Sequence, residues 1–330
     1  DALPGLSQKA DVTREMVSED GVGHGCGHHM LGAAATTAAI VIKRFLEKGN
    51  KKGTVRFYGC PEEELLSGKV KMAYYHMFDG CDAAVTWHPS STNMAHDHAY
   101  LANASAHFYF HGVSSHAAFA PEQGRSALDA VELMSVGANY LREHVIDRTR
   151  IHYSTDSGGF APNIVPDKAS AWYFVRAPHM ADVKSTMERL KKVAQGAAMM
   201  TETTVDIEME CGCCELSTNE AFADLAYANL IEADGPKYTK EELQFAKELQ
   251  KTVEQGIIEK GKNLHQVYDE AMILGVSPRD KWKEAELSAS SDTGDVSRIM
   301  PTCLFTTACW PIGCSPHTWQ ATASVGTSIG

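Results

Sequence analysis

The sequence predicts an α/β domain that is interrupted by a smaller α+β module. Three patterns predict this fold. Residues 32–86 alternate helix and strand composition in the rhythm of an α/β sheet. Residues 104–210 follow the order strand, helix, strand, helix, strand. The chain after residue 215 is again mainly helical.

In the larger domain, the residues 32–48 are rich in alanine and end on cations, which is typical of a helix. We expect strands at 54–58 and 83–86, a helix at 69–78, and a late strand at 304–307. Polar residues follow several of these strands, where active sites of α/β sheets collect.

The smaller module begins near residue 102. Residues 104–110 and 203–210 alternate like half-buried strands, and residues 169–176 are a further strand candidate. Residues 126–143 and 181–200 are amphipathic and predict two helices. Beyond the module we expect helices at 219–232 and 240–259, a polar surface segment at 260–287, and a loop at 288–295.

Composition excludes several classes of protein. The net charge of −12 argues against nucleic acid and against an anionic membrane as partners. No apolar run approaches the roughly 20 residues that span a membrane, and we expect no signal peptide from the opening residues. Nine scattered cysteines favour reduced thiols and therefore a cytoplasmic protein.

Four segments carry residues suited to metal chemistry. Cys26 and His28 lie among glycines and could turn onto one ion, although a glycine-rich turn with incidental polar residues has the same composition. Glu62–Glu64 follow a strand candidate, where they could divide metal binding and proton transfer or simply begin a helix. His88 and His317 are each ambiguous alone, so the metal interpretation depends on all four segments together.

A rival cluster is Cys211-Gly212-Cys213-Cys214. It has no nearby histidine, and we favour plain reduced cysteines over a zinc or copper site.

Together these segments resemble the co-catalytic metallopeptidase family of aminoacylases, carboxypeptidase G and auxin-conjugate hydrolases. Within that family they are most similar to the aminobenzoyl-glutamate hydrolase group. The matching segments, in chain order, are 1–8, 23–28, 59–64 with 67–69, 87–89, 112–117 with 124–129, 163–166 with Arg176, 291–297 and 316–320.

The resemblance implies a two-domain architecture. A catalytic α/β domain, residues 1–102 and 215–330, would carry the metals, and an inserted α+β lid, residues 103–214, would cover the substrate and form a homodimer. It also implies a small amide substrate with a free carboxylate, and it allows a second type of subunit.

The resemblance also implies residue roles. Two divalent metal ions, zinc or manganese, would be held by five ligands, of which the first would bridge them: Cys26, His28, Glu64, His88 and His317. Glu63 would be the general base. His116 would reach the partner subunit's active site and stabilise the oxyanion, while Asn163 and Arg176 would hold the substrate carboxylate. Asp1 would orient the site from behind.

The sequence departs from the family pattern at two places. Glu62 adds a carboxylate before the usual pair, and His29 stands where the family has Asp or Asn. Both ends of the chain also look short for the family. These departures motivate an alternative, a catalytically impaired homologue that binds metal and serves as a regulatory or partner subunit. A thiol enzyme that uses Cys26 as its nucleophile is a third hypothesis.

Overall fold

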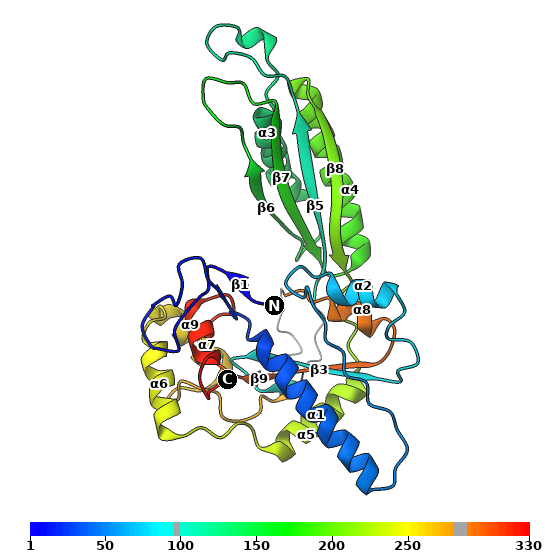
Figure 1. The fold of residues 1–330 in the computed structure, drawn as a ribbon, viewed down its shortest axis with the longest axis vertical. Helices are drawn as coiled ribbons and strands as arrows, with labels where there is room; N and C mark the ends of the chain where they lie inside the picture. The colour runs from blue at the N-terminus through cyan, green and yellow to red at the C-terminus, as the bar shows by residue number, and fades with distance from the viewer. Residues whose placement is uncertain (96–99, 280–288) are drawn as a thin grey trace.

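The structure is a computed structural model that describes residues 1–95, 100–279 and 289–330. It consists of an elongated α+β unit that stands on a second, α/β unit which contains both chain termini (Figure 1). The mixed helix and sheet architecture confirms the predicted fold class.

The elongated unit is built on one antiparallel sheet. Its strands are β5 (Ala102–His111), β6 (Arg150–Ser157), β7 (Lys168–Ala177) and β8 (Thr204–Cys213), in the order β6-β7-β5-β8. Because side chains alternate between the two faces of a strand, each strand can offer one face to a core and one face to other partners. One face of β5 and β7 supplies the core of this unit.

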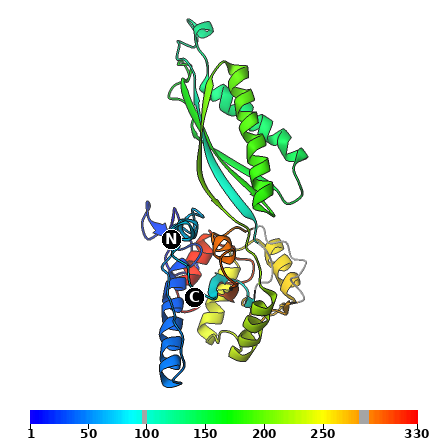
Figure 2. The same ribbon diagram turned by 90° about the vertical axis from the view of Figure 1, so that its right-hand side faces the viewer.

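Two helices cover that apolar face, α3 (Ala127–Leu141) and α4 (Met180–Thr201) (Figure 2). The hydroxyl of Ser126 accepts a hydrogen bond from the backbone N–H of Asp129 and so caps α3 at the predicted start. Short 3₁₀ turns at Pro121–Gln123 and Arg142–His144 flank the helix. The opposite face of the sheet, which carries Asn103 and Arg176, points away from both helices.

The second unit contains a three-stranded sheet of β3 (Ala84–Ser90), β9 (Thr302–Ala308) and β4 (Met94–Ala95), in which β3 and β9 are parallel. Strands β1 (Leu3–Pro4) and β2 (Val22–Gly23) form a small separate pair. The helices of this unit are α1 (His28–Lys48), α2 (Gly68–Tyr74), α5 (Glu220–Ala233), α6 (Lys240–Gln250), α7 (Gln255–His265), α8 (Thr293–Ser297) and α9 (Trp319–Val325).

One predicted strand is wrong. Residues 54–58 have strand composition but form no strand, and Val55 and Phe57 remain exposed. β3 pairs with β9 in the described sheet, and residues 54–58 pair with neither. Residues with high strand propensity form a strand only where they can pair and be half-buried, so composition alone does not determine the secondary structure of this segment.

The predicted helix at 240–259 is two helices. α6 ends at Gln250 and α7 begins at Gln255. The hydroxyl of Thr252 donates to the carbonyl of Leu249 at 2.7 Å, in a turn that contains two consecutive β-branched residues, Thr252 and Val253. Local bonding of this kind competes with the continued helix.

Three further differences concern less regular parts of the chain. Strand β6 was not predicted, because its residues are mostly exposed and show little apolar alternation. The segment 260–287 is not uniformly at the surface, since Ala271, Met272 and Ile273 are buried. The predicted loop at 288–295 gives way to α8 from Thr293 onward, and residues 280–288 lie outside the described part of the chain.

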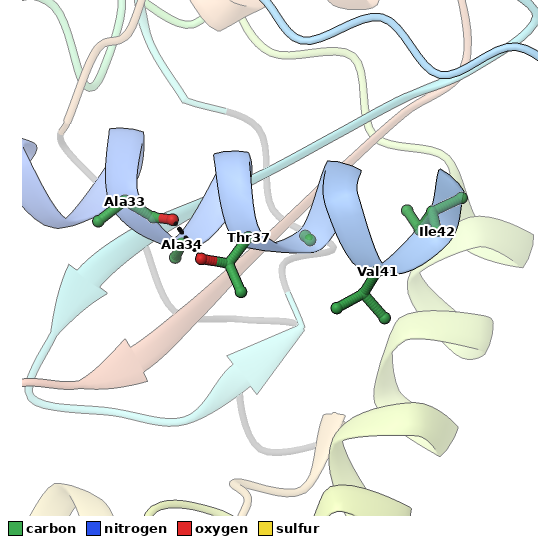
Figure 3. Close-up of a pocket in the computed structure, with 6 residues that line it drawn as sticks. Ala33, Ala34, Thr37, Val41 and Ile42 are labelled. Carbon is green, nitrogen blue, oxygen red and sulfur yellow. Dashed lines mark hydrogen bonds between the residues drawn. The ribbon is translucent and has the colours of Figure 1, made fainter. Parts of the chain in front are cut away.

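One face of α1 is apolar and open. Of its 21 residues only His28 is buried. A shallow hollow there is lined by Ala33, Ala34, Thr37, Val41 and Ile42, and the Thr37 hydroxyl is bonded back to its own helix (Figure 3). These lining residues offer no converging polar groups, so we assign the hollow no chemistry. Within the described residues, no helix has the length and apolar character needed to cross a membrane.

The core of the elongated unit gives a stability prediction. Met134 on α3 is fully buried, whereas Val136 on the same helix is 49% exposed. Met134→Ala should lower the free energy of unfolding by about 2–5 kcal/mol through lost burial and a residual cavity. Val136→Ala should change it by less than about 0.5 kcal/mol. Urea denaturation measures both, and equal effects of the two substitutions would contradict this description of the core.

Candidate metal centre and active site

Four separate segments deliver the side chains of the site. Cys26 and His28 lie at the start of α1, Glu64 lies in the loop before α2, His88 lies on β3 and His317 lies in the loop before α9. Backbone turns are needed to aim them. Gly27 has a φ of 70°, and a Cβ there would meet Met30 at 2.8 Å and Pro89 at 3.1 Å, so glycine is required between the two ligand candidates.

The first donor group is Cys26, His28 and His88, whose ligand atoms all lie within 4.8 Å of one another. The Nε2 atoms of the two histidines are 3.3 Å apart. Two nitrogens that each lie about 2.0–2.1 Å from one tetrahedral zinc ion are separated by about 3.3–3.4 Å. The separation of the two imidazoles therefore fits a shared cation.

The second donor group is Cys26, Glu64 and His317. The Oε2 atom of Glu64 lies 3.3 Å from Nε2 of His317. Its Oε1 atom lies 3.6 Å from Nδ1 of His28, and a third group joins His28 to both Glu63 and Glu64. Cys26 belongs to both of the first two groups, which is the arrangement that a bridging ligand requires.

Two buried polar atoms in this cluster lack hydrogen-bond partners among the described residues. They are Nδ1 of His28 and Oε1 of Glu64. An unpaired buried polar atom costs free energy, and native structures pair such atoms with protein, water or an ion. Thiolate, imidazole and carboxylate together are the donors that zinc takes. The residues present therefore fit a divalent cation.

Electrostatics favour neutral imidazoles at the first group. Burial lowers the pKa of His28 to about 3, and burial also lowers the pKa of His88. Burial, followed by the charges of Glu64 and Glu63, raises the pKa of the Cys26 thiol. A coordinating cation would reverse that effect, because coordinated thiols lose their proton.

The second group is charged. Burial by itself would raise the pKa of Glu64, but the hydrogen bond from His317 and the nearby charge of that ring bring this pKa below its usual value. The same hydrogen bond raises the pKa of His317. The two side chains thus stabilise each other as an ion pair.

Glu63 lies beside the donors and is held from behind. Its Oε1 accepts a hydrogen bond of 3.0 Å from the Ser291 hydroxyl, and its Oε2 lies 3.5 Å from His28 Nε2. Burial raises the pKa of Glu63. Glu62 points elsewhere, because it pairs with Lys71 and accepts from Ser67 at the surface.

A buried ion pair fixes the loop that carries Ser291. Asp292 is fully buried and accepts from both the backbone N–H and the ammonium of Lys69 at 2.7 Å. These contacts tie the start of α2 to the start of α8. The sequence by itself indicates no individual role for Lys69, Ser291 or Asp292, although they fall in segments that match the family.

Asp1 and His29, which the sequence also singles out, differ in whether they contact the donors. Asp1 Oδ2 accepts from the backbone N–H of Glu64 at 3.1 Å, next to the site. His29, which follows His28 in the sequence, turns away. Its ring contacts that of His24, and its Nε2 lies 3.2 Å from the carbonyl of Val325. His29 is absent from the donor groups found among the described residues.

Arg176 lies at the end of β7 nearest the second unit. Its Nη1 donates to the Ser290 hydroxyl at 3.2 Å. The next residue, Ser291, donates its hydroxyl to Glu63. Adjacent serines therefore contact Arg176 and Glu63, the proposed base. Burial lowers the pKa of Arg176, and its charge also acts on His317.

His116 and Asn163 are not brought to the donors within one chain. They lie in the segments that follow β5 and precede β7, at the end of the sheet farthest from the second unit (Figure 1). A strand of ten residues spans about 30 Å. Asn163 and Arg176, predicted to act together, therefore lie at opposite ends of β7.

The rival cysteine cluster supplies no donor group. Cys211, Cys213 and Cys214 form no disulfide, and none of them enters a candidate metal group of the described residues. That they are plain reduced cysteines stays a prediction. A small hollow of about 250 Å³ does adjoin the site. His317 contributes to its wall, together with Leu6, Arg14 and Trp319.

Comparisons with known proteins identify the family. The model of a peptidase dimerisation domain matches residues 102–199. A subunit of the p-aminobenzoyl-glutamate hydrolase of Escherichia coli is 41% identical over 100% of this chain and 71% of its own length. The Xaa-Arg dipeptidase of Mus musculus is 32% identical over 57% of this chain and 44% of its own length.

A solved structure from methicillin-resistant Staphylococcus aureus, described as an aminohydrolase, shares the fold. It is 17% identical with a TM-score of 0.58, and the match covers 98% of this chain and 78% of that one. Fold and relatives together define a hydrolase that acts on amide bonds. The chain belongs to the peptidase family of aminoacylases and carboxypeptidase G, in which it is similar to the p-aminobenzoyl-glutamate hydrolase of Escherichia coli.

The donor set predicts which substitutions remove metal. Cys26→Ser and His88→Ala should each lower the amount of zinc or manganese that the protein retains, because each removes a donor from the first group. His29→Ala is the matched control, since the neighbouring ring faces Val325. Equilibrium dialysis followed by elemental analysis measures the retained metal. Loss of metal from His29→Ala equal to that from His88→Ala would refute the assignment.

Proposed function

We propose that this chain hydrolyses the amide bond of an N-acyl or N-aroyl amino acid, such as an aminobenzoyl-glutamate-like compound, or of a related dipeptide. The reaction would use two divalent cations, zinc or manganese. The observation that carries the proposal is the convergence of Cys26, His28, Glu64, His88 and His317 beside Glu63. The similarity to a hydrolase of p-aminobenzoyl-glutamate supports the substrate class.

Two donor groups would hold the cations, with Cys26 common to both. When bound, such ions polarise a carbonyl oxygen and lower the pKa of water toward neutrality. The shared Cys26 supports a pair of ions, and the mixed donors suit zinc, with manganese as the alternative.

Glu63 would act as the general base. The Ser291 hydroxyl occupies its Oε1, which leaves Oε2 directed toward the donors. In that position the carboxylate can take a proton from the attacking water and pass it to the leaving nitrogen. Burial raises its pKa, which favours a group that both accepts and returns a proton.

His116 would serve the active site of a partner subunit. Its Nδ1 accepts from the backbone N–H groups of Ala118 and Phe119, so the proton of the neutral ring lies on Nε2, which can donate to an oxyanion. Phe119 and Phe160, in the loops at the same end of the sheet as His116, are 87% and 101% exposed. Such exposed aromatic side chains support the burial of this end of the sheet against another chain. Asn163 lies beside the segment of His116, since its carbonyl accepts from the backbone N–H of Ala117. From the partner subunit, its side chain would help Arg176 to hold the substrate carboxylate.

Arg176 would bind the free carboxylate of the substrate, because its planar fork suits that group. The hollow beside His317 would then be available to the acyl or aroyl half. We retain residues 1–102 with 215–330 as the proposed catalytic domain and residues 103–214 as the proposed lid. A cytoplasmic location remains a prediction.

A regulatory or partner subunit is the second candidate function. The similarity to a protein named as a subunit favours it. A hydrolysis assay with aminobenzoyl-glutamate and a panel of N-acyl amino acids, in added zinc or manganese, separates the two. Turnover that chelation and ligand substitutions abolish supports the enzyme, whereas metal binding without turnover supports the impaired subunit.

Glu63 gives a direct test of the mechanism. Glu63→Gln should lower kcat by about 10²–10⁴-fold, because general base catalysis typically contributes that much. Glu62→Gln is the control and should leave kcat almost unchanged, since Glu62 faces Lys71. Metal content should be the same in both. Near-normal turnover by metal-loaded Glu63→Gln would show that the base is misassigned.

Mixed dimers test the role of His116. His116→Ala and Glu63→Gln should each be inactive alone. If His116 acts across the dimer, unfolding and refolding them together should restore roughly a quarter of the wild-type rate, because half of randomly paired dimers are mixed and carry one complete site each. Size-exclusion chromatography confirms pairing. No recovery in paired dimers would place His116 outside the partner's chemistry.

A further inference from the structure

Asn103 on β5 has a buried side-chain amide that makes no hydrogen bond to the described residues. It has no exposed surface, and both Nδ2 and Oδ1 lack hydrogen-bond partners among the described residues. Asn93, by contrast, is a buried asparagine whose side-chain amide has hydrogen-bond partners for both its nitrogen and its oxygen. Its amide donates to the carbonyls of Ile273 and Gly275 and accepts from the backbone N–H of Ala308. Because an unpaired buried amide is destabilising, Asn103 implies a missing partner.

Arg176 is the immediate neighbour of Asn103. The two residues are directly opposite in the antiparallel pair β5 and β7, on the face away from the helices, and side chains at such positions are adjacent. Nε of Arg176 is also buried and, among the described residues, unpartnered. Its Nη1 donates to the neutral hydroxyl of Ser290. Arginines at buried positions are normally paired with an acid.

The missing partner is therefore a small anion that also offers a donor. A carboxylate can occupy the guanidinium fork in place of the Ser290 hydroxyl, since a charge-assisted pair is stronger than a neutral hydrogen bond. Nδ2 of Asn103 can donate to the same carboxylate. Its Oδ1 needs an N–H group close by. An N-acyl α-amino acid presents both features, because its amide N–H and its carboxylate are attached to one carbon atom.

We propose that Asn103 and Arg176 together form the subsite that recognises the α-carboxylate and the adjacent amide N–H of the substrate. This inference rests on the proposed amide hydrolysis and names the residue that selects the substrate class. Asn103 would distinguish N-acyl α-amino acids from amides that lack a neighbouring carboxylate.

The position of this subsite suits the reaction. The Arg176 guanidinium contacts Ser290, and Ser291 contacts Glu63. Consecutive Cα atoms are about 3.8 Å apart. In an N-acyl α-amino acid the carboxylate and the scissile amide nitrogen are attached to the same carbon atom. A carboxylate at Arg176 therefore leaves the amide bond on the side of the proposed base.

Asn103→Asp tests the specificity. A carboxylate at this position would repel the substrate carboxylate and compete for Arg176. We expect KM for aminobenzoyl-glutamate to rise by about tenfold to a hundredfold, with kcat changed by less than about threefold. KM for the α-carboxamide of the same compound should stay within about threefold of the wild-type value. An equal rise for both compounds, or no rise for either, would overturn the proposal.

Asn103→Val provides a readout that needs no turnover. If the amide is kept for a ligand, replacing it with an apolar strand former should raise the Tm of the ligand-free protein. Asn93→Val should lower Tm, because it leaves backbone groups unpaired. A fall in Tm for Asn103→Val as large as that for Asn93→Val would show that Asn103 is structural.

The two proposals fail in different ways. Wild-type protein without turnover, or Glu63→Gln with normal turnover, would refute the hydrolase. Wild-type turnover that discriminates carboxylate from carboxamide, with the same discrimination in the Asn103 variants, would refute the subsite alone.

Discussion

The site depends on one constraint. The side chains of Cys26, His28 and Glu64 lie close together away from solvent, and they make fewer hydrogen bonds than their polar atoms require. His28 and Glu64 each keep a buried atom that is unpartnered within the described residues, and burial with nearby carboxylates disfavours ionisation of Cys26. A divalent cation held by these residues would relieve all three problems, because it would accept a lone pair from each donor and supply positive charge. The tight turn at Gly27 and the parallel pair of β3 and β9 serve to bring these donors into contact.

The loop before α8 organises the surroundings of the cluster. Asp292 anchors it to Lys69 in a buried, hydrogen-bonded ion pair, and removal of either partner would leave an unpaired charge. Ser290 and Ser291 then face in two directions, toward Arg176 and toward Glu63. One anchored loop thus sets the relative positions of the proposed carboxylate anchor and the proposed base, which lie on different units of the molecule.

The sequence predicts those parts of the fold whose signal is local. The helices α3 and α4 and the strands β5 and β7 follow from periodicity and from composition. The strand predicted at residues 54–58 is wrong because a strand forms only where it can pair with another strand. Strand β6 is not predicted because an exposed edge strand shows little apolar alternation. At the site, the residue types and the family likeness indicated the donors, but only coordinates separate the surroundings of Glu62 from those of Glu63. No sequence pattern points to Asn103, because its distinguishing feature is the lack of a hydrogen-bond partner among the described residues, which only the three-dimensional structure can show.

We propose above all that the dispersed donors enclose cations. Anomalous diffraction from crystals grown with zinc, recorded on both sides of the zinc absorption edge, tests it most directly. We expect two neighbouring peaks, one in contact with His28 and His88, the other in contact with Glu64 and His317, and both in contact with Cys26. Peaks elsewhere, such as at Cys211 and Cys213, or an empty cluster in a zinc-saturated crystal, would contradict it.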